Sequence, residues 1–320
     1  MKAIIVREFG APEVLKLEET ADLQPSEMQI LVKIKAAGVN PVDTYVRSGN
    51  HATAPKLPFT PGKDGAGIVE AVGAKISKVK TGDRVYLANS VSGTYAEYAL
   101  ANEDQVYKLP GNVSFEQGAG VAVPYATSFW GLFDKGKPMT GETILIHGAS
   151  GGVGIAAIQH AKHFGLTVIG TASSDEGRSL IKEQGADFVF DHSAPGYLDE
   201  ILAATNGDGV NMVLEMLANV NLQNDLNIVA KKGRIVVIGN RGETTINPRS
   251  IMNKDATIRG FSLHTLNGAE MANIHTSLYE GLEGGWLAPV VGRSFPLAEA
   301  AAAHRAVIED KAFGKIVLTV

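Results

Sequence analysis

The chain has 320 residues, enough for two domains that each bury a core of their own. Its net charge of −5 and the lack of any Lys/Arg cluster argue against nucleic acid as a partner. The apolar stretches are much shorter than a membrane span, and residues 1–7 have the pattern of a strand and not of a signal peptide. These features favour a cytoplasmic globular protein without membrane attachment.

Residues 1–123 are expected to form a β-rich domain. Short apolar runs that alternate with polar residues, such as 30–35 and 67–72, are bounded by Gly and Pro. Turn signals recur at Gly38 and Gly62. This rhythm is typical of a compact, curled β domain.

From Thr143 onward, predicted strands and helices alternate. The run 143–147 is short and apolar, like a buried strand, and the residues that follow, up to Phe164, carry apolar side chains at helical spacing. This alternation is typical of a parallel sheet covered on both faces, and six strands predict a doubly wound Rossmann fold. The other five strands are predicted at 166–170, 188–190, 210–214, 234–238 and 257–261.

The C-terminal residues are predicted to return to the β-rich domain. Helices are expected at 268–282 and 297–309, followed by a strand at 314–319 that pairs back with the N-terminal residues. The predicted fold is therefore α/β, with a Rossmann domain at 124–267 inserted into a β-rich domain made of 1–123 and 268–320.

The strongest motif is Gly148-Ala149-Ser150-Gly151-Gly152-Val153-Gly154, which follows a strand and opens a helix. Gly151 lets the backbone approach a pyrophosphate, Gly154 lets the helix pack closely on the strand, and the helix N-terminus supplies N–H groups. Ala149 stands where the usual fingerprint has its first glycine, so the match is imperfect. An ordinary glycine turn is the alternative, but the strands downstream favour dinucleotide binding at Ser150, Gly151, Gly152 and Val153.

The end of the second predicted Rossmann strand favours NADPH over NADH. NAD-selective enzymes usually place Asp or Glu here, whereas this chain has Thr171-Ala172-Ser173-Ser174. Ser173 and Ser174 leave room for a 2′-phosphate and bring no negative charge, although they can also cap the next helix. Arg178, about one helical turn further on, can supply positive charge.

Four segments carry a resemblance to a known family: residues 38–49, 148–154, 215–221 and 239–242. They are similar to zeta-crystallin-type quinone oxidoreductases, which belong to the medium-chain dehydrogenase/reductase superfamily. The stretch Glu-Met-Leu-Ala-Asn-Val-Asn at 215–221 resembles the zeta-crystallin branch in particular. The resemblance extends over nearly the whole chain and implies a GroES-like β domain together with a Rossmann domain.

Zinc-containing members of that superfamily carry a Cys after the equivalent of Gly38, a His after the equivalent of Gly62, and a second Cys. Here those two places hold Val39-Asn40 and Lys63-Asp64, and the chain contains no cysteine at all. The eight histidines are scattered without the spacing of metal ligands, so a structural or surface role is preferred for each. The sequence therefore predicts a site without metal.

The resemblance also implies further cofactor contacts. Asn40 and Tyr45 fall where relatives line the nicotinamide pocket, and Tyr45 would orient nicotinamide or substrate from a loop. Alternatively, Asn40 is a turn residue before Pro41, Tyr45 is a core or turn aromatic, and Arg241 is a solvated loop charge. The remaining implied contacts are Thr127 at the domain crossing, His192 near the adenosine phosphate, Asn219 and Asn221 near the ribose and nicotinamide, Gly239, Asn240 and Arg241 after the fifth strand, and Phe261, Ser262 and Leu263 at the nicotinamide amide.

The function implied is reduction of quinones with NADPH, in which the cofactor carries the hydride chemistry and the protein orients the reactants. The alternatives are reduction of the double bond of enones or alkenals, and a non-catalytic crystallin-like protein that binds NADPH or RNA. The acidic balance disfavours RNA. His51 stands where many relatives have Tyr, so the wall of the substrate site can differ from theirs. The physiological substrate stays open, and so does the choice between one- and two-electron transfer. Relatives commonly form homodimers or homotetramers, which implies a homo-oligomer here.

Overall fold

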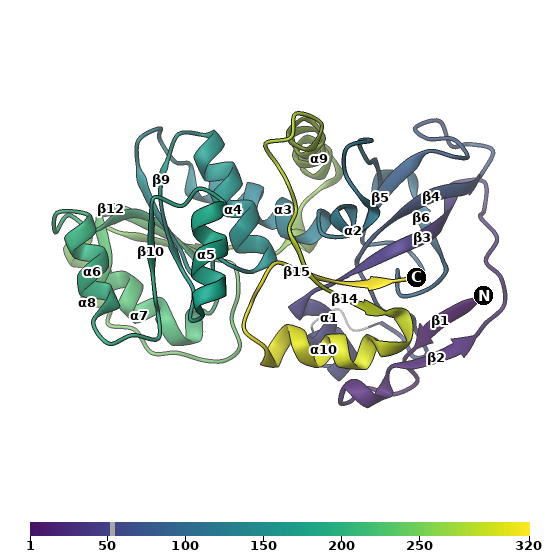
Figure 1. Ribbon diagram of the computed structural model, residues 1–320, viewed down its shortest axis with the longest axis horizontal. Coiled ribbons are helices and arrows are strands. Elements are labelled where there is room, and N and C mark those ends of the chain that lie inside the picture. The colour runs from purple at the N-terminus through teal and green to yellow at the C-terminus, as the bar shows by residue number, and fades with distance from the viewer. Residues whose placement is uncertain (52–54) are drawn as a thin grey trace. The chain divides into compact units, whose positions relative to one another are not determined.

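The computed structural model describes residues 1–51 and 55–320. Its contacts divide the chain into two compact units, which are described separately (Figure 1). The β unit consists of Met1–Val123, His275–Asp310 and Gly314–Val320. The Rossmann unit consists of Pro124–Ile274 and Lys311–Phe313.

The described part of the β unit contains a seven-stranded sheet in the order β14-β15-β3-β4-β5-β7, with β6 also paired to β3, and a two-stranded sheet of β1 and β2. These strands are β1 (Lys2–Ile5), β2 (Lys16–Glu19), β3 (Gln29–Val39), β4 (Asp64–Val72), β5 (Arg84–Ala88), β6 (Tyr98–Asn102), β7 (Val106–Lys108), β14 (Val291–Pro296) and β15 (Lys315–Thr319). The helical segments are η1 (Pro12–Val14), α1 (Pro41–Ser48), η2 (Glu103–Gln105), α2 (Phe115–Gly118), η5 (Leu297–Glu299) and α10 (Ala300–Glu309).

The core of the β unit follows from the alternation seen in the sequence. Val32 and Ile34 of β3 are buried in one apolar cluster, while Lys33 between them is exposed. The last strand, β15, pairs antiparallel with β3, with Leu318 opposite Ala37. The predicted return of the chain end to the N-terminal residues is therefore confirmed.

The Rossmann unit has a sheet in the order β10-β9-β8-β11-β12-β13, with all neighbouring strands parallel. This is the strand order of a doubly wound dinucleotide-binding fold, as predicted. The strands are β8 (Thr143–Ile146), β9 (Thr167–Thr171), β10 (Phe188–Phe190), β11 (Val210–Glu215), β12 (Val229–Val237) and β13 (Thr257–Gly260). The helical segments are η3 (Trp130–Gly136), α4 (Gly152–His163), α5 (Asp175–Glu183), α6 (Tyr197–Ala204), α7 (Ala218–Ile228), α8 (Pro248–Lys254) and η4 (Leu263–Thr265), and α3 (Ala122–Phe129) and α9 (Gly268–Glu283) each span a boundary between the units.

Both faces of the Rossmann sheet are buried, which explains why its strands are apolar at successive positions. Ile144 and Ile146 of β8 pack in a cluster with Ile158 of α4 on one face. Leu145 packs on the opposite face with Ile201 of α6. Because successive side chains point to opposite faces, a strand covered by helices on both sides needs no polar alternation.

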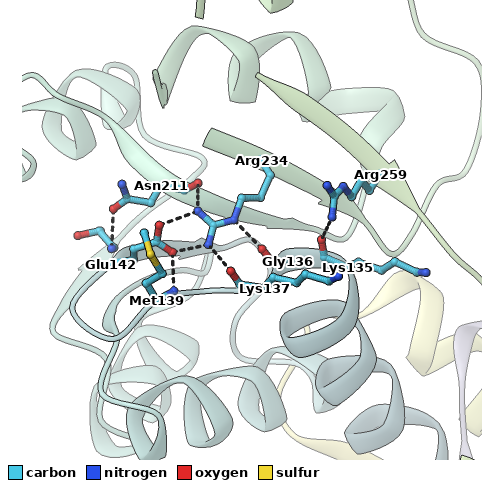
Figure 2. Close-up of polar contacts among 9 residues, drawn as sticks. Lys135, Gly136, Lys137, Met139, Glu142, Asn211, Arg234 and Arg259 are labelled. Atoms are coloured by element: carbon cyan, nitrogen blue, oxygen red, sulfur yellow. Dashed lines mark hydrogen bonds and ion pairs between the residues drawn. The ribbon is translucent and has the colours of Figure 1, made fainter. Parts of the chain in front are cut away.

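A polar group built around Arg234 ties together the segments near the start of β8 (Figure 2). The guanidinium of Arg234, on β12, forms an ion pair with Glu142 and donates to the backbone carbonyl of Gly136 at 2.7 Å. It also donates to the carbonyls of Asn211 at 3.1 Å and Lys137 at 3.3 Å. Arg234 thereby fixes the end of η3 and the loop that leads into β8.

One sequence-based expectation of local structure is corrected. Residues 40–45 were expected to be a loop, but α1 begins at Pro41, with Asn40 as its N-cap residue. Proline at the first helical position after a polar cap is itself a helix-start signal. Within residues 1–51 and 55–320, none of the helices combines the length and the apolar character that crossing a membrane requires.

Candidate functional site

The glycine loop of the Rossmann unit connects β8 to α4. Gly151 is the N-cap residue of α4, which begins at Gly152 and runs for 12 residues. The N–H groups of Gly152 and Val153 have no carbonyl one turn earlier, so they lack an acceptor within the helix. Together with the helix dipole, these N–H groups form an anion-binding helix end.

Two glycines of this loop are required by the backbone. Gly148 has a φ of +55°, where a residue with a Cβ is strained. A Cβ on Gly154 would lie 2.5 Å from the Cα of Ala149, so α4 could not pack this closely on its own loop. Ala149, which stands where the usual fingerprint has its first glycine, is fully buried.

Ser150 is bonded to a segment that the sequence did not connect with the loop. Its hydroxyl donates to the carbonyl of Ala312 at 2.7 Å. Ala312 belongs to Lys311–Phe313, the short C-terminal piece of the Rossmann unit. The contact joins residues 162 positions apart, and no motif in the sequence signals it.

The end of β9 carries the serines that were proposed to receive the 2′-phosphate. Ser174 is the N-cap residue of α5, and its Oγ accepts from the N–H of Gly177 at 3.0 Å. Ser173 beside it is half-buried. The capping role expected as an alternative for Ser174 is therefore realised, and it leaves a lone pair of the same oxygen for other donors.

Arg178 folds back toward the end of β9 and does not extend into solvent. Its Nη1 donates to the carbonyl of Ala172 at 3.3 Å and lies 2.9 Å from Oδ2 of Asp191. Its Nη2 forms a second ion pair with Asp175. The positive charge therefore stands next to the serines, but it is shared with two carboxylates.

His192 follows β10 and lies beside the same strand end. Its Nδ1 is 3.2 Å from the hydroxyl oxygen of Thr171, the last residue of β9. Burial lowers the pKa of His192, and the neighbouring His147 adds to this effect. His192 is thus a neutral hydrogen-bonding group at physiological pH and not a source of charge.

The segments that follow β11 and β12 are bonded to each other. The N–H of Ala218 donates to the carbonyl of Gly239 at 3.0 Å, and the N–H of Arg241 donates to Oδ1 of Asn219 at 2.9 Å. A Cβ on Gly239 would lie 2.2 Å from the carbonyl oxygen of Met216, so only glycine allows this approach. The structure thus brings together two of the segments that carry the family resemblance.

Other proposed contacts in these segments have partners of their own. Asn221 donates through Nδ2 to Oε1 of Glu215 at 3.2 Å, and Asn240 donates to the carbonyl of Gly242 at 2.6 Å. Arg241 is exposed. That exposure leaves open the alternative of a solvated loop charge.

The last group of proposed contacts follows β13. Phe261 packs against the apolar cluster on one face of the sheet, and Leu263 begins η4. Ser262 is exposed, with its Oγ 2.6 Å from Nδ1 of His264. Thr127 is buried within α3. Because neighbouring strands are parallel, the ends of β8, β9, β11, β12 and β13 lie at one edge of the sheet, and residues 261–263 directly follow the last of these strands.

Asn40 belongs to the β unit and is part of a buried polar network. Its Nδ2 donates to Oδ2 of Asp64 at 2.9 Å, and its Oδ1 accepts from the ammonium of Lys315. Lys315 also lies 3.1 Å from Oδ2 of Asp64, and both side chains are almost completely buried. The N–H of Val123 donates to the other oxygen of Asp64 at 2.9 Å. Sequence reasoning missed Lys315, which lies 275 positions from Asn40.

Tyr45 lies in the middle of α1 and is half-buried. On the same helix, Asp43 accepts from the N–H of Asn40 at 2.8 Å through Oδ2. Burial raises the pKa of Asp43 to about 6, although this hydrogen bond opposes the rise. The start of α1 therefore places a titratable carboxyl next to the residue proposed to line the nicotinamide pocket.

A second set of titratable side chains includes His147, the residue directly before the glycine loop of the Rossmann unit. His147, Glu215 and Asp225 are buried, and their donor atoms lie within 4.8 Å of one another. The combination resembles a metal site in composition. However, Nε2 of His147 is already 2.8 Å from Oδ1 of Asp225, the distance of a direct hydrogen bond. We therefore describe it as a hydrogen-bonded cluster.

Comparison with known proteins agrees with this division into two units. A family model described as "Alcohol dehydrogenase GroES-like domain" matches residues 26–111. A second model, described as "Zinc-binding dehydrogenase", matches residues 152–276. Together the two models cover most of the β unit's N-terminal part and most of the Rossmann unit.

Individual relatives match along the whole chain. The quinone oxidoreductase of Sus scrofa is 48% identical over 99% of this chain and 97% of its own length. Among solved structures, an NAD-dependent alcohol dehydrogenase is 30% identical with a TM-score of 0.94, and each chain is covered completely. The Escherichia coli quinone oxidoreductase, solved with NADPH, is 29% identical with a TM-score of 0.92, again with complete coverage of both. The chain is therefore an oxidoreductase of the quinone oxidoreductase family, within the medium-chain dehydrogenase/reductase superfamily.

Proposed function

We propose that this protein reduces quinones with NADPH and needs no zinc ion to do so. The observation that carries the proposal is the glycine loop at the N-terminus of α4, combined with a basic residue and two serines at the end of β9. Family membership supports the reaction class, because the Sus scrofa relative is a quinone oxidoreductase.

The glycine loop fits the pyrophosphate of a dinucleotide. The N–H groups of Gly152 and Val153 point out of the helix end, and Gly151 adds no side chain above them. A Cβ at Gly151 would lie 3.4 Å from the Cβ of Ala312, so a side chain here would contact residues 311–313. NADPH, when bound, supplies a hydride, and this hydride together with one proton from water converts a quinone to a hydroquinone and leaves NADP⁺.

The end of β9 suits NADPH better than NADH. Residues 171–174 contain no acidic side chain that would repel a 2′-phosphate, and the guanidinium of Arg178 lies beside them. The solved relatives include both cofactor types, since one was solved with NADPH and another is NAD-dependent. The lack of an acidic side chain at 171–174 and the nearby guanidinium of Arg178 favour NADPH for this chain, although that guanidinium is also paired with Asp175 and Asp191.

Zinc independence is supported by the polar network of the β unit. Asn40 and Asp64 come from the two segments in which zinc-containing relatives carry ligands, and both are bonded to the buried ammonium of Lys315. A divalent cation bound beside that ammonium would be repelled at close range. Quinones accept hydride readily, so this reaction needs little electrophilic help from a metal ion.

The substrate is then a small molecule, and the resemblance further implies a homodimer or homotetramer in the cytoplasm. Light scattering of the purified protein tests the assembly, and fractionation of cells that produce it tests the location. A monomer at working concentration would contradict the proposed homodimer or homotetramer.

Steady-state kinetics with a panel of electrophiles tests the function. Purified protein should oxidise NADPH rapidly with 1,4-benzoquinone or phenanthrenequinone and slowly with enones and alkenals. Faster turnover of enones would favour double-bond reduction instead. Tight binding of NADPH without turnover of any electrophile would favour the non-catalytic, crystallin-like alternative.

A further inference from the structure

Three ionisable side chains meet in the interior of the Rossmann unit. His147 directly follows β8, Glu215 is the last residue of β11, and Asp225 lies on α7. Strands β8 and β11 are parallel neighbours, with Leu214 opposite Ile146, so the residues at their carboxyl ends are adjacent. All three side chains are at most 3% exposed.

The cluster has more acceptors than donors. Nε2 of His147 lies 2.8 Å from Oδ1 of Asp225 and 3.6 Å from Oε2 of Glu215, so its single hydrogen can serve only one carboxylate well. Oε2 of Glu215 and Oδ2 of Asp225 are buried without a hydrogen-bond partner among the described residues. Two adjacent buried carboxylates with one neutral imidazole would carry two uncompensated charges, which is strongly unfavourable.

Protonation removes that problem. Burial raises the pKa of Glu215 to about 7; the interaction with His147 opposes this rise, and the neighbouring charge of Asp225 adds to it. Burial likewise raises the pKa of Asp225 to about 7, whereas it lowers the pKa of His147. The proton that the cluster holds near neutral pH is therefore carried by the carboxyl groups and not by the imidazole.

The other oxygen of Glu215 holds the segment that follows β11. Oε1 accepts from the backbone N–H of Leu217 and, at 3.2 Å, from Nδ2 of Asn221. In the same segment, Asn219 accepts from the N–H of Arg241. One carboxyl group thus joins the buried cluster on one side to residues 216–221 on the other.

We propose that His147, Glu215 and Asp225 form a proton-sharing cluster that positions residues 216–221 for the cofactor. The coupling to the cofactor rests on the proposed function. With a proton between the two carboxyls, Glu215 stays in place and its Oε1 orders the segment. When that proton is lost, repulsion between the two carboxylates moves Glu215 and loosens its bonds to Leu217 and Asn221. Glu215 is therefore a positioning residue, and the cofactor binds more weakly as the pH rises above neutrality.

Two ionisable side chains from other elements face the cluster. His192, which follows β10, interacts with His147, and Tyr197 of α6 interacts with Glu215 and Asp225. The pKa of His192 is lowered and that of Tyr197 is raised, both mainly by burial. Between pH 7 and 9 neither group changes charge, so a pH effect in this window reports on the carboxyls.

Infrared spectroscopy of the protein without cofactor tests the shared proton. The pH 6.5 minus pH 9 difference spectrum should contain the C=O band of a buried protonated carboxylic acid. The cluster's part of this band should be weaker in Glu215→Gln and in Asp225→Asn, which keep the shape of each side chain, and lost in the double variant, because burial raises the pKa of each carboxyl on its own. Asp199→Asn removes one exposed negative charge from α6 and serves as the matched control, in which the band should remain.

Binding and hydrogen exchange test the positioning role. For the wild type and the control, the Kd of NADPH should rise by up to roughly tenfold per pH unit above the transition, the limit for loss of one proton. In the double variant Glu215→Gln/Asp225→Asn, which has no cluster carboxyl left to titrate, the Kd should be nearly constant from pH 7 to 9. Hydrogen exchange of residues 216–221, corrected for intrinsic rates, should accelerate over the same range only in the wild type and control. NADH gives a parallel series without the 2′-phosphate, whose own pKa is about 6.

Three results would overturn the proposal. Absence of the carboxylic band at pH 6.5 would show that the cluster holds no carboxyl proton. A band whose loss changes neither hydrogen exchange nor Kd would show that the cluster does not position the segment. Stoichiometric zinc that disappears in Glu215→Gln would show that the cluster binds metal. If neither cofactor binds at any pH, the proposed function fails, while the infrared and exchange results still decide the cluster.

Discussion

The guanidinium of Arg234 and the carboxylate of Glu142 form a two-pronged ion pair in which every N–H of the arginine has an acceptor (Figure 2). Both side chains are 13% exposed. The remaining donors bind the backbone carbonyls of Gly136 and Lys137, which precede β8, and of Asn211 in β11. One side chain thus joins β12 to segments that are remote from it in the sequence.

Arg234→Met should therefore destabilise the Rossmann unit. Removing Arg234 leaves the carboxylate of Glu142 with only the N–H of Met139 and leaves several backbone carbonyls without donors in a poorly hydrated place, which costs roughly 3 kcal/mol. Urea unfolding measures the change in the free energy of unfolding. Arg293→Met is the matched control, because Arg293 pairs with Asp310 at the surface and its loss should cost less than about 1 kcal/mol. Equal losses in both variants would contradict the structural role of Arg234.

A second prediction concerns acid stability and His275 of the β unit. His275 stacks on Tyr107 and lies 2.8 Å from the hydroxyl of Tyr86 through Nδ1. Burial lowers the pKa of His275 to about 3. Below pH 6.5 the unfolded chain takes up a proton on His275, whereas the folded chain keeps this residue neutral. The free energy of unfolding therefore decreases as the pH falls from 6.5 toward 3.

His275→Phe should remove that dependence while keeping an aromatic ring against Tyr107. At pH 7.5 the variant should be less stable than the wild type, because the hydroxyl of Tyr86 loses its partner. Between pH 7.5 and 5 the difference should shift by about 2 kcal/mol in favour of the variant. Thermal unfolding across this range measures the shift, and His264→Phe, at an exposed position, is the control. A difference that does not change with pH would show that folding leaves the ionisation of His275 unaltered.

Much of the fold could be predicted because the Rossmann strands are apolar on both faces and are separated by helices with regular spacing. The glycine loop could be predicted because backbone requirements at Gly148 and Gly154 leave a signature in the sequence. In contrast, Lys315 and Ala312 contact residues that are 275 and 162 positions away. No local pattern encodes such pairs, so sequence reasoning from one chain could not find them.

The buried cluster was missed for a related reason. His147 has no metal-like or catalytic spacing to Glu215 or Asp225, and only the adjacency of β8 and β11 brings the three together. The segment 40–45 was misassigned because similarity to the family suggested a loop, although Asn40-Pro41 is a local helix-start signal. The residues at 40–41 carry a local signal for the start of a helix, whereas no local signal shows which strands will be neighbours.

We predict that the purified protein contains no stoichiometric zinc. Lys315 supplies the positive charge beside Asp64 that a metal ion would otherwise provide, and the chain has no cysteine ligand. Elemental analysis should find far less than one zinc per chain, and quinone reduction should survive incubation with a chelator. Activity that is lost with chelator and restored by zinc would refute this prediction.

Tyr45 should influence turnover through positioning and not through proton transfer. Its side chain is half-buried on α1, the helix that Asn40 caps. Tyr45→Phe removes only the hydroxyl and should reduce kcat/KM modestly, by less than about tenfold, whereas Tyr45→Ala removes the ring and should cost more. The Phe variant should also keep the pH profile of kcat. Wild-type kinetics in both variants would assign Tyr45 a purely structural role.

Arg178 should give the enzyme its preference for NADPH. The guanidinium is already turned toward the end of β9 by the carbonyl of Ala172, so little reorganisation is needed to meet a 2′-phosphate. Its ion pairs with Asp175 and Asp191 oppose this, because a phosphate must compete with those carboxylates. A charge-assisted hydrogen bond contributes roughly 1.5–3 kcal/mol, so one such bond corresponds to more than tenfold in kcat/KM.

Arg178→Ala should therefore lower kcat/KM for NADPH by about tenfold or more and leave that for NADH nearly unchanged. Asp191→Asn should have the opposite effect on NADPH, because it removes a competing carboxylate while its amide can still hold the loop. Lys182→Ala on the same helix is the control, since its side chain is exposed in the last turn of α5. Steady-state kinetics with both cofactors at fixed ionic strength measures these ratios. If wild-type kcat/KM is equal or higher with NADH, or if Arg178→Ala affects both cofactors alike, the end of β9 does not select the phosphate, and the preference must come from another part of the Rossmann unit.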